Sequence, residues 1–546
     1  MAYVITQNCC KDASCVPVCP VDCIRPLGGA GEFTGTEMLY IDPVACIDCG
    51  ACLEECPVDA IHYDEDLPPE LERFKDINAG YFERHPLEPD TPAEPAQQRS
   101  VPPGSLRVAI VGAGPAACYA ANALIGVEGL EVDLFERLPT PFGLIRAGVA
   151  PDHQHTKSVV RIFDHVFRNK RFGCHLNIEI GKDLTHDDLL AHHHAVVYAV
   201  GASRSRELDI AGENLAGNHS AVDFVGWYNG HPDHADHDFD LSGERAVIVG
   251  NGNVALDVAR VLLLDPDRLA QTDIAEHALE ALLHSNIREV VILGRRGPRD
   301  AAFSAGEFLA LGHLPGVDVV IDSAELEANS TDDVETELKL QIAREYADKP
   351  NNPDNKRIVF RFLTSPAEII GSECAEGLRI VSNHLDEDGG LIPGDPSGGT
   401  EVIETPLILR SIGYRGSAIE GLPFDEAKGV VLNDRGRVID DNGNALPGVY
   451  VTGWIKRGPR GVIGTNRNCA EETVGNLLDD FDAGLLARGV RGREEIATLL
   501  AERGATPVGW DGWRAIDAAE RKRGAEASRP RVKFVDIADL VTSAKS

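Results

Sequence analysis

Apolar runs alternate with helical patterns over most of the chain, beginning with a strand that opens at Leu106. Nearly continuous apolar stretches occur at 108–111, 132–135 and 246–249. Short runs that are apolar on both faces are typical of buried parallel strands. The segments between them follow the helical period through about residue 480. This alternation predicts an α/β fold with parallel sheets.

The two ends of the chain depart from this pattern. The amino-terminal region offers only two short apolar pieces, 3–6 and 38–42, which we expect to form strands. Residues 64–105 are rich in proline and charge, which predicts a partly extended linker or an ordered segment in a fixed arrangement. The last sixty or so residues are polar and helical, with Trp510 and Trp513 as expected anchors.

These changes in composition and hydrophobic pattern along the chain predict a small first domain, a linker and two larger α/β domains. One of the α/β domains is expected to be completed by the carboxyl-terminal part of the chain. The expected boundaries are 1–63 for the first domain, 64–105 for the linker, 106–242 with 440–546 for the first α/β domain, and 243–439 for the second. A chain of 546 residues, 43% of them hydrophobic, has material for several such cores.

Charge and hydropathy narrow the classes of partner. The formal net charge of −35 disfavours nucleic acid and anionic membrane surfaces, because both bind cationic patches. No apolar run approaches the about 18 residues of a membrane span, and the chain does not open with a cationic segment followed by an apolar one. The cysteines after residue 100 are far apart, which fits a reducing compartment, so a cytoplasmic location is expected.

Nine of the thirteen cysteines lie within the first fifty-six residues. The run Cys46-x2-Cys49-x2-Cys52-x3-Cys56-Pro57 has the complete bacterial iron–sulfur spacing. An irregular partner run precedes it, with the pattern Cys9-x5-Cys15-x3-Cys19-Pro20. A zinc site would have two cysteine pairs separated by a longer loop, and a disulfide framework would need an exported chain. The doubled run therefore predicts iron–sulfur ligation.

In two-cluster proteins the last cysteine of a run crosses to the cluster of the other run. Crossing predicts one four-iron cluster and a second site with three thiols. The four-iron ligands would be Cys19, Cys46, Cys49 and Cys52, and the second set would be Cys9, Cys15 and Cys56. Three thiols suit a [3Fe-4S] cluster, whereas Cys10 as a fourth ligand would permit a second [4Fe-4S] cluster. The sequence leaves both open.

Two glycine fingerprints each follow a predicted strand. The first, Gly112-x-Gly114-x-x-Ala117, is followed by a helix and by Glu136 at the end of the next strand, an arrangement that binds a dinucleotide with its ribose on the acid. The second, Gly250-x-Gly252-x-x-Ala255, is followed by a strand at 289–293 and then by an arginine pair at 295–296. Arginines in place of the acid favour a 2′-phosphate, hence NADP, unless they form a solvated turn.

Three longer motifs add a family resemblance. The stretches 139–153 (PTPFGLIRAGVAPDH), 250–260 (GNGNVALDVAR) and 453–466 (GWIKRGPRGVIGTN) closely resemble adrenodoxin-reductase-type NADPH–ferredoxin reductases. That resemblance covers roughly residues 106–545. The amino-terminal part resembles a seven- or eight-iron bacterial ferredoxin, and the whole chain resembles the ferredoxin/ferredoxin–NADP reductase fusions. The resemblance of the whole chain implies two Rossmann-like dinucleotide-binding domains, for FAD and NADP, preceded by a small α+β ferredoxin domain.

The resemblance also implies roles for individual residues. FAD would be bound by Gly112, Gly114, Ala116, Glu136, Leu144, Ile180, Trp454, Gly461, Val462 and Ile463. NADP would be bound by Arg206, Gly250, Asn251, Gly252, Asn253, Val254, Arg295, Arg296, Glu307 and Gly461. His153 and Glu307 match family residues near the flavin and the nicotinamide, and each has either a direct catalytic role or a structural one.

The implied activity is hydride transfer from NADPH to FAD, followed by single-electron transfer to the fused clusters and then to ferredoxin or another one-electron acceptor protein. The alternative is an iron–sulfur flavoprotein reductase with its own small-molecule substrate. Separately, His192, His193 and His194 are expected at an exposed helix–strand junction.

Overall fold

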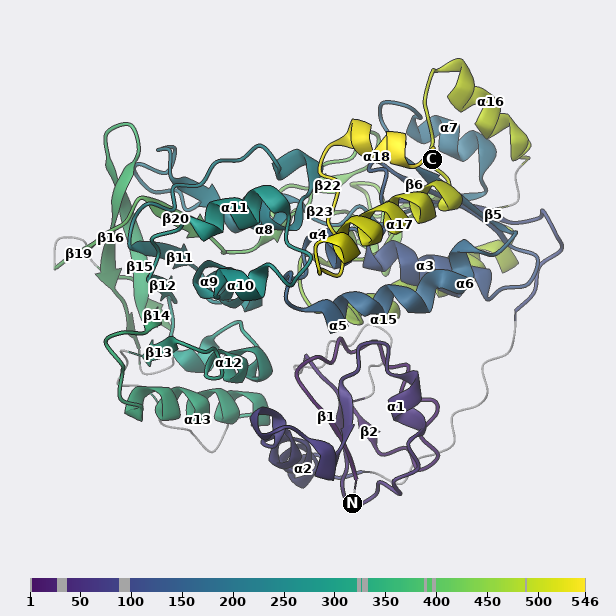
Figure 1. Cartoon of the computed structure of the whole chain (residues 1–546). Helices are drawn as coiled ribbons and strands as arrows, with labels where there is room; N and C mark the ends of the chain where they lie inside the picture. Colours follow the sequence, from purple (N-terminus) through teal and green to yellow (C-terminus); the bar gives the residue numbers. More distant parts are fainter. Residues whose placement is uncertain are drawn as a thin grey trace.

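A mostly parallel sheet with an antiparallel edge and an all-parallel sheet form the cores of the two larger domains (Figure 1). The computed structural model describes residues 2–26, 37–87, 99–321, 326, 332–386, 390–394, 399–486 and 489–545. The parallel sheets, their alternating helices and the small first domain agree with the predicted fold class. Among these described residues, no helix combines the length and the apolar character that crossing a membrane requires.

The first sheet has seven strands and is completed by chain from far later in the sequence. In spatial order they are β24 (Asn433–Asp434), β25 (Arg437–Ile439), β26 (Ala445–Val451), β8 (Ala195–Tyr198), β5 (Arg107–Val111), β6 (Glu131–Glu136) and β7 (Phe172–Leu176). β5 is buried along its whole length and pairs in parallel with β6 and β8. β24 and β25 belong to this sheet although they precede the expected boundary at residue 440.

Two helices from distant parts of the chain cover one face of this sheet. α3 (Pro115–Ile125) follows the first glycine turn, and α15 (Thr465–Asp482) packs against it. Four of the five alanines of α3 are buried, which lets the two helices approach closely. Shorter helices complete the fold: α4 (Leu144–Ala147), α5 (Gln154–Lys157), α6 (Asp164–Phe167), α8 (Ala221–Asn229), α10 (Pro266–Leu269), α11 (Glu276–Leu283), α14 (Trp454–Arg457), α16 (Glu494–Glu502) and α18 (Ile537–Ser543).

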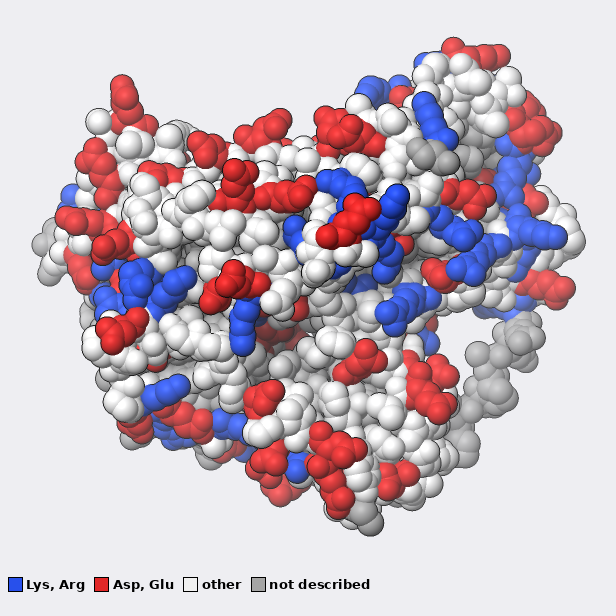
Figure 2. Space-filling view, viewed as in Figure 1, with Lys and Arg blue, Asp and Glu red and all other residues white. Residues whose placement is uncertain are grey.

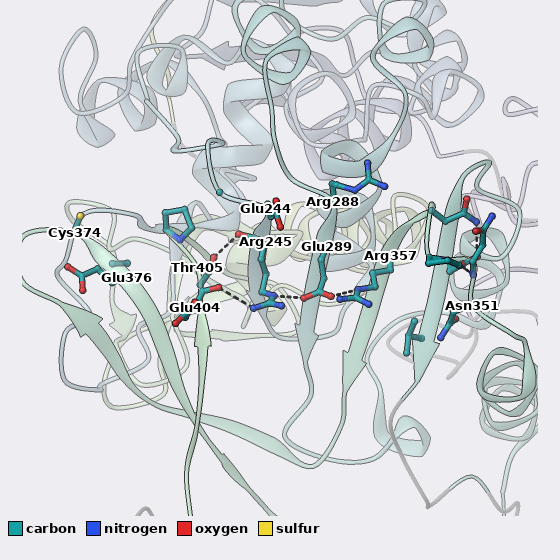
Figure 3. Close-up of a pocket in the computed structure, with 18 residues that line it drawn as sticks. Glu244, Arg245, Arg288, Glu289, Asn351, Arg357, Cys374, Glu376, Glu404 and Thr405 are labelled. Atoms are coloured by element: carbon teal, nitrogen blue, oxygen red, sulfur yellow. Dashed lines mark hydrogen bonds and ion pairs between the residues drawn. The ribbon is translucent and has the colours of Figure 1, made fainter.

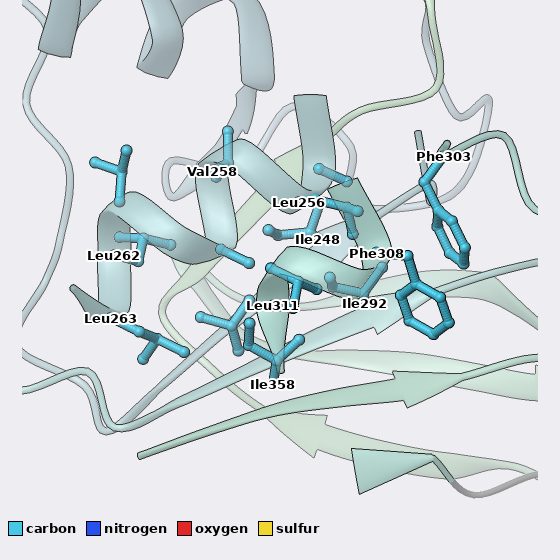
Figure 4. Packing of buried hydrophobic residues seen from close by; sticks show 14 of the residues in the cluster. Ile248, Leu256, Val258, Leu262, Leu263, Ile292, Phe303, Phe308, Leu311 and Ile358 are labelled. Carbon is cyan, nitrogen blue, oxygen red and sulfur yellow. The ribbon is translucent and has the colours of Figure 1, made fainter. Parts of the chain in front are cut away.

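The second sheet has six strands, all paired in parallel. In spatial order they are β10 (Asn218–Ser220), β20 (Leu407–Arg410), β11 (Arg245–Val249), β12 (Glu289–Leu293), β14 (Lys356–Arg361) and β13 (Val317–Ile321). α9 (Asn253–Leu263) and α12 (Ala305–Leu311) pack on it, and Figure 4 shows Leu256 and Leu262 of α9 over Ile248 and Ile292 of the sheet. An antiparallel sheet of β15 (Thr364–Gly371), β16 (Ala375–Ser382) and β19 (Glu401–Glu404) is an addition that simple alternation does not predict.

The small first domain, here called the cysteine module (described residues 2–26 and 37–63), has two short antiparallel pairs. β1 (Tyr3–Ile5) pairs with β4 (Ile61–Tyr63), and β2 (Ile24–Arg25) pairs with β3 (Tyr40–Ile41). β1 and β3 lie within the two apolar pieces expected to form strands. α1 (Ala51–Glu55) lies within the second cysteine run. The module contacts both α/β domains (Figure 1).

Part of the expected linker is a helix packed between domains. α2 (Phe74–Arg84) lies between the cysteine module and α13 (Val334–Asp348) of the second α/β domain (Figure 1). The buried Asn78 side chain accepts hydrogen bonds from the Ile5 and Ile41 amides, at 3.2 and 2.9 Å. Arg73 pairs with Glu345 of α13. Residues 64–87 therefore hold the module in place rather than leaving it loosely tethered.

The expectation that the histidine triplet is exposed is wrong. His192, His193 and His194 do join α7 (His186–His192) to β8, but all three are buried. The Nε2 atom of His193 lies 3.4 Å from a carboxylate oxygen of Asp133 in β6. Arg493 also pairs with Asp133, at 2.8 Å. Polar composition suggested solvent exposure, but a network of partners satisfies these side chains inside the fold.

The carboxyl-terminal helix α17 (Trp510–Glu526) is anchored on the first α/β domain. Trp513 is buried and Trp510 stacks on Phe167, with 4.4 Å between ring centroids, so both tryptophans are anchors as predicted. Glu520 is fully buried and its two carboxylate oxygens accept bonds from Arg146 at 2.9 and 2.6 Å. Burial favours the neutral acid, but the charge of Arg146 outweighs it and holds the pKa of Glu520 below its usual range.

Replacing Glu520 with alanine is expected to destabilise the protein by about 3–5 kcal/mol, because it leaves the Arg146 guanidinium buried without its carboxylate. Glu526→Ala, at an exposed position of the same helix, is the matched control. Since the pKa of Glu520 is lowered on folding, its contribution is full above the ordinary carboxyl pKa and is lost as the pH falls through the folded-state value. Urea unfolding of both variants measures the difference, and equal losses would contradict this account.

Candidate redox site

The first glycine turn forms an open cradle at the start of α3. Gly112 ends β5 with φ at 103°, and a β-carbon there would lie 2.7 Å from the carbonyl oxygen of Ala199. Gly114 has no neighbour within 4 Å of its β-carbon position, so space is open at the helix amino terminus. The Glu136 carboxylate accepts bonds from the Ala113 amide at 2.8 Å and the Leu138 amide at 3.0 Å. An open helix terminus beside a fixed carboxylate fits a dinucleotide pyrophosphate and ribose.

Segments predicted to bind FAD from elsewhere in the sequence lie around this cradle. Gly453 ends the loop after β26, and a β-carbon there would lie 2.5 Å from the β-carbon of Ala116. Trp454 opens α14, with its ring 5.5 Å from that of Tyr414. Leu144 begins α4 and is 42% exposed. The structure thus brings residues 453–463 against the first α/β domain. Ile180, which is also predicted to bind FAD, packs against a separate core cluster of that domain that includes Val111 and Phe135.

The second glycine turn repeats this geometry at the start of α9. Gly250 has φ at 110°, and a β-carbon there would lie 2.3 Å from the carbonyl oxygen of Ser411. A β-carbon at Gly252 would meet only Ala302, at 3.9 Å. Arg295 and Arg296 are exposed directly after β12, the strand next to β11. The pair therefore lies at the carboxyl edge of the sheet, where the ribose of a dinucleotide belongs.

Three other residues predicted to bind NADP make contacts within the protein. A β-carbon at Gly294 would lie 2.7 Å from the side-chain amide nitrogen of Asn251, which places Asn251 beside the start of the arginine pair. The Arg206 amide donates to the Gly413 carbonyl at 3.2 Å, beyond the end of β20. The Asn253 side chain donates to Glu37 of the cysteine module at 2.6 Å. The fingerprint pattern does not predict that contact.

A cluster of charged groups lies where the two α/β domains meet. His153, Asp257 and Glu307 have ligand atoms within 4.8 Å of one another, although they are distant in sequence. The buried Arg260 guanidinium lies 2.7 Å from Asp152, 2.8 Å from Asp257 and 3.6 Å from Glu307. The structure therefore brings together His153 and Glu307, both singled out from the sequence.

Sequence reasoning missed Asp257 and Arg260 as members of this cluster. Both lie in the quoted stretch 250–260, three positions apart, which places them on one face of α9. Burial raises the pKa of Asp257 although the charge of Arg260 opposes it. For Asp152, Arg260 outweighs burial and lowers the pKa. Arg260 already supplies a cation to the surrounding carboxylates, so the cluster is suited to orienting a ligand and holding a proton.

Electrostatic interactions connect module cysteines within each of the two predicted ligand sets. Cys15 lies close enough to Cys9 and Cys56 for electrostatic interaction. Cys52 interacts in the same way with Cys46, Cys19 and Cys49. The sulfurs of Cys19 and Cys23 lie 3.5 Å apart. We call Cys9, Cys15 and Cys56 the inner thiols, and Cys19, Cys46, Cys49 and Cys52 the outer thiols.

Burial raises the pKa of both Cys9 and Cys52 to about 11. A buried thiol of this kind becomes a thiolate when a bound metal supplies the positive charge, so both groups fit iron–sulfur ligation. The Cys10 side chain instead packs in the hydrophobic core that includes Ala116 and Tyr119 of the first α/β domain.

The inner thiols lie against the loop that is predicted to cover FAD. The Gly464 amide donates to the carbonyl oxygen of Cys10 at 2.8 Å, and Arg467 donates to the carbonyl of Asp12 at 2.8 Å. Ile463 and the inner thiol Cys9 pack against the same core. A β-carbon at Gly464 would lie 1.9 Å from the Lys11 carbonyl oxygen, which shows how closely the two backbones approach.

A separate hollow of about 860 Å³ lies at the other edge of the second sheet. Figure 3 shows Arg245, Glu289 and Arg357 side by side across the starts of three neighbouring strands, with Glu289 paired to both arginines. Ligands of open α/β sheets bind at the carboxyl ends of the strands, where Gly250 lies. This hollow is therefore distinct from the dinucleotide cradle.

Two dinucleotide cradles, a charged cluster where the two α/β domains meet and thiols beside the first cradle define a pyridine-nucleotide oxidoreductase joined to an iron–sulfur module. The sequence profile of the pyridine nucleotide-disulphide oxidoreductase family matches residues 106–293, and that of the 4Fe-4S binding domain matches 39–62. The chain belongs to the ferredoxin/ferredoxin–NADP reductase family, as its similarity to full-length relatives shows.

Those relatives are named probable ferredoxin/ferredoxin–NADP reductases. The protein of Mycobacterium leprae is 46% identical over 100% of this chain and 98% of its own length. The protein of Mycobacterium tuberculosis is 47% identical over 100% of this chain and 95% of its own length. A solved structure of FprA from Mycobacterium tuberculosis in complex with NADPH covers 81% of this chain and 100% of its own, with 44% identity and a TM-score of 0.76.

Proposed function

We propose that the protein is an FAD-dependent NADPH–ferredoxin oxidoreductase that carries its first one-electron acceptors in the same chain. The first cradle would bind FAD and the second NADP(H), and the inner and outer thiols would hold two iron–sulfur clusters. The observation that carries this proposal is the direct contact of Gly464 with the backbone of Cys10, which brings the FAD-covering loop against the inner thiols.

FAD, when bound, accepts two electrons as hydride and passes them on singly, which is the chemistry needed between NADPH and iron–sulfur clusters. The chain's own residues would bind and orient the two dinucleotides and enclose the flavin. Glu136 would hold the flavin dinucleotide ribose, and the arginine pair at 295–296 would hold the 2′-phosphate of NADPH. The cluster of His153, Asp257 and Glu307 around Arg260 lies where the two α/β domains meet, and there it would position the nicotinamide.

We assign the clusters an order from the contacts of their ligands. Two inner thiols, Cys9 and Cys56, pack against the core of the first α/β domain. The outer thiols Cys19, Cys46 and Cys52 pack in the module core, and Cys49 is exposed. An electron that enters from FAD would therefore reach the inner site first and the outer site second. Three inner thiols, with Cys10 packed into the neighbouring core, support a [3Fe-4S] cluster there and a [4Fe-4S] cluster at the outer site.

Chemical analysis is expected to give about seven iron atoms per chain, with a [3Fe-4S] signal in the EPR spectrum of the oxidised protein. Cys10→Ser should leave both the iron count and that signal unchanged, because Cys10 is not assigned as a ligand. An iron count of about eight that falls in Cys10→Ser would show that Cys10 completes a second four-iron cluster.

The function itself is tested by mixing the purified protein with NADPH and excess cytochrome c. Rapid one-electron reduction of the cytochrome without any organic substrate is the expected result. A requirement for an organic substrate would favour the alternative, a flavin enzyme in which the clusters serve only as internal carriers.

A further inference from the structure

The outer thiols are surrounded by apolar side chains that face solvent. Val44 is 92% exposed, Ile47 is 58% exposed and Leu53 is 43% exposed. Each lies within two residues of an outer thiol, and Val21, at 36%, is two residues after Cys19. Cys49 is itself exposed. These four apolar residues, here called the exit patch, are a third or more of the exposed large hydrophobic residues among those the structure describes.

This exposure has no explanation in the folding of the module. Its own core is complete, with Ile5, Ile24, Leu39, Ile41 and Ile61 at no more than 2% exposure. Scattered apolar residues are ordinary on a protein surface, but a group gathered beside one site marks a contact surface. The inner thiols differ, because Cys9 and Cys56 pack against the core of the first α/β domain and Cys15 is buried.

The charge along the chain around Val44, Ile47 and Leu53 is negative. Between Tyr40 and Glu72 the chain has ten acidic residues and no lysine or arginine. Asp48, Glu54 and Glu55 are exposed and lie next to outer thiols or next to the patch. Figure 2 shows acidic side chains over the cysteine module, including the region where Figure 1 labels α1. The patch thus combines an apolar centre with an anionic rim, which is the usual anatomy of a protein interface.

We propose that the exit patch is the docking surface for the external electron acceptor, and that this acceptor is a protein with a lysine- or arginine-rimmed apolar face around its own redox centre. The inference rests on the proposed function, because it takes the outer thiols as cluster ligands. The anionic rim would steer a cationic partner and repel an acidic one. Apolar contact at Val44 and Ile47 would then bring the partner's redox centre close to Cys49.

The step served by this contact moves one electron and forms no bond. With cytochrome c as the probe, the haem iron passes from ferric to ferrous while the protein loses one electron, and NADPH is the source. Nothing except the partner's redox centre needs to approach the module, so the exit patch and the NADPH site can be occupied together.

The test measures binding before activity. Oxidised protein is titrated with oxidised cytochrome c by calorimetry at low ionic strength, and the same titration is repeated with acetylated cytochrome c, which lacks the lysine charges. Glu54→Lys/Glu55→Lys is expected to weaken binding about tenfold or more, as is typical of electrostatically steered pairs. Val44→Ser/Ile47→Ser should also weaken it, while Glu502→Lys, exposed on the remote α16, should not.

The rate of NADPH–cytochrome c reduction should fall with the affinity, while NADPH–ferricyanide reduction stays unchanged. Equal binding of native and acetylated cytochrome c, equal weakening by Glu502→Lys, or no effect of either patch variant would overturn the proposal. Dissociation of a dimer by Val44→Ser/Ile47→Ser would overturn it too, by assigning the patch to a second copy of this chain. Failure of the proposed function is distinguishable, because NADPH would then not reduce the clusters even with no partner present.

Discussion

Replacing Gly464 with alanine is expected to slow the reduction of the clusters by NADPH about 10²-fold, the effect that a displacement of about 1 Å at a reacting geometry can have. The new β-carbon would lie 1.9 Å from the carbonyl oxygen of Lys11 and 2.4 Å from the amide nitrogen of Asp12. Both are backbone atoms, so the side chains cannot relieve the clash. The cysteine module must move away from the loop that covers FAD.

The substitution tests the contact without straining the loop, because Gly464 has φ at −67°, which any residue adopts. Gly475→Ala is the matched control on the same helix, since its β-carbon position has no neighbour within 4 Å. Stopped-flow absorbance separates flavin reduction, which should be unchanged in both variants, from cluster reduction. A Gly464→Ala protein that reduces its clusters at the control rate would show that electrons do not cross at this contact.

Replacing both Arg295 and Arg296 with alanine is expected to lower kcat/KM for NADPH about 10³-fold, since charge-assisted hydrogen bonds contribute about 1.5–3 kcal/mol each. The two guanidiniums follow β12 at the edge of the sheet where the second cradle opens. We propose that they recognise the 2′-phosphate, which NADH lacks. Steady-state rates with NADH should therefore be unchanged, and the preference for NADPH should disappear.

Arg514→Ala removes one exposed positive charge from a distant helix and serves as the control for the general field of the protein. If the double variant lost activity with NADPH and NADH equally, the pair would have a structural role. If it kept its preference for NADPH, the 2′-phosphate would be recognised elsewhere, with Arg206 the next candidate.

Local rules explain why much of the site was predictable from the sequence. Gly112 and Gly250 have positive φ and their β-carbon positions are blocked by backbone, so the sequence must have glycine at both turns. The expected cysteine groups combine the spacing within each run with the rule that the last cysteine of a run crosses to the other cluster. At the glycine turns the constraint acts over a few residues.

Contacts between distant segments were not predictable in the same way. Asn253 lies in the fingerprint, yet its side chain donates to Glu37 of the cysteine module. The helix α2 lies in a segment whose proline and charge content suggested an extended linker, and Asn78 fixes it by bonding to strands of that module. Asp257 and Arg260 acquire a role only when the domains place Asp152 and Glu307 beside them.

The most direct test of the central claim is anaerobic rapid mixing of the protein with NADPH, with absorbance followed for flavin and freeze-quenched EPR followed for the clusters. The account predicts that the flavin is reduced first, the inner cluster second and the outer cluster last, with no added carrier. A fully reduced flavin beside clusters that stay oxidised would contradict it.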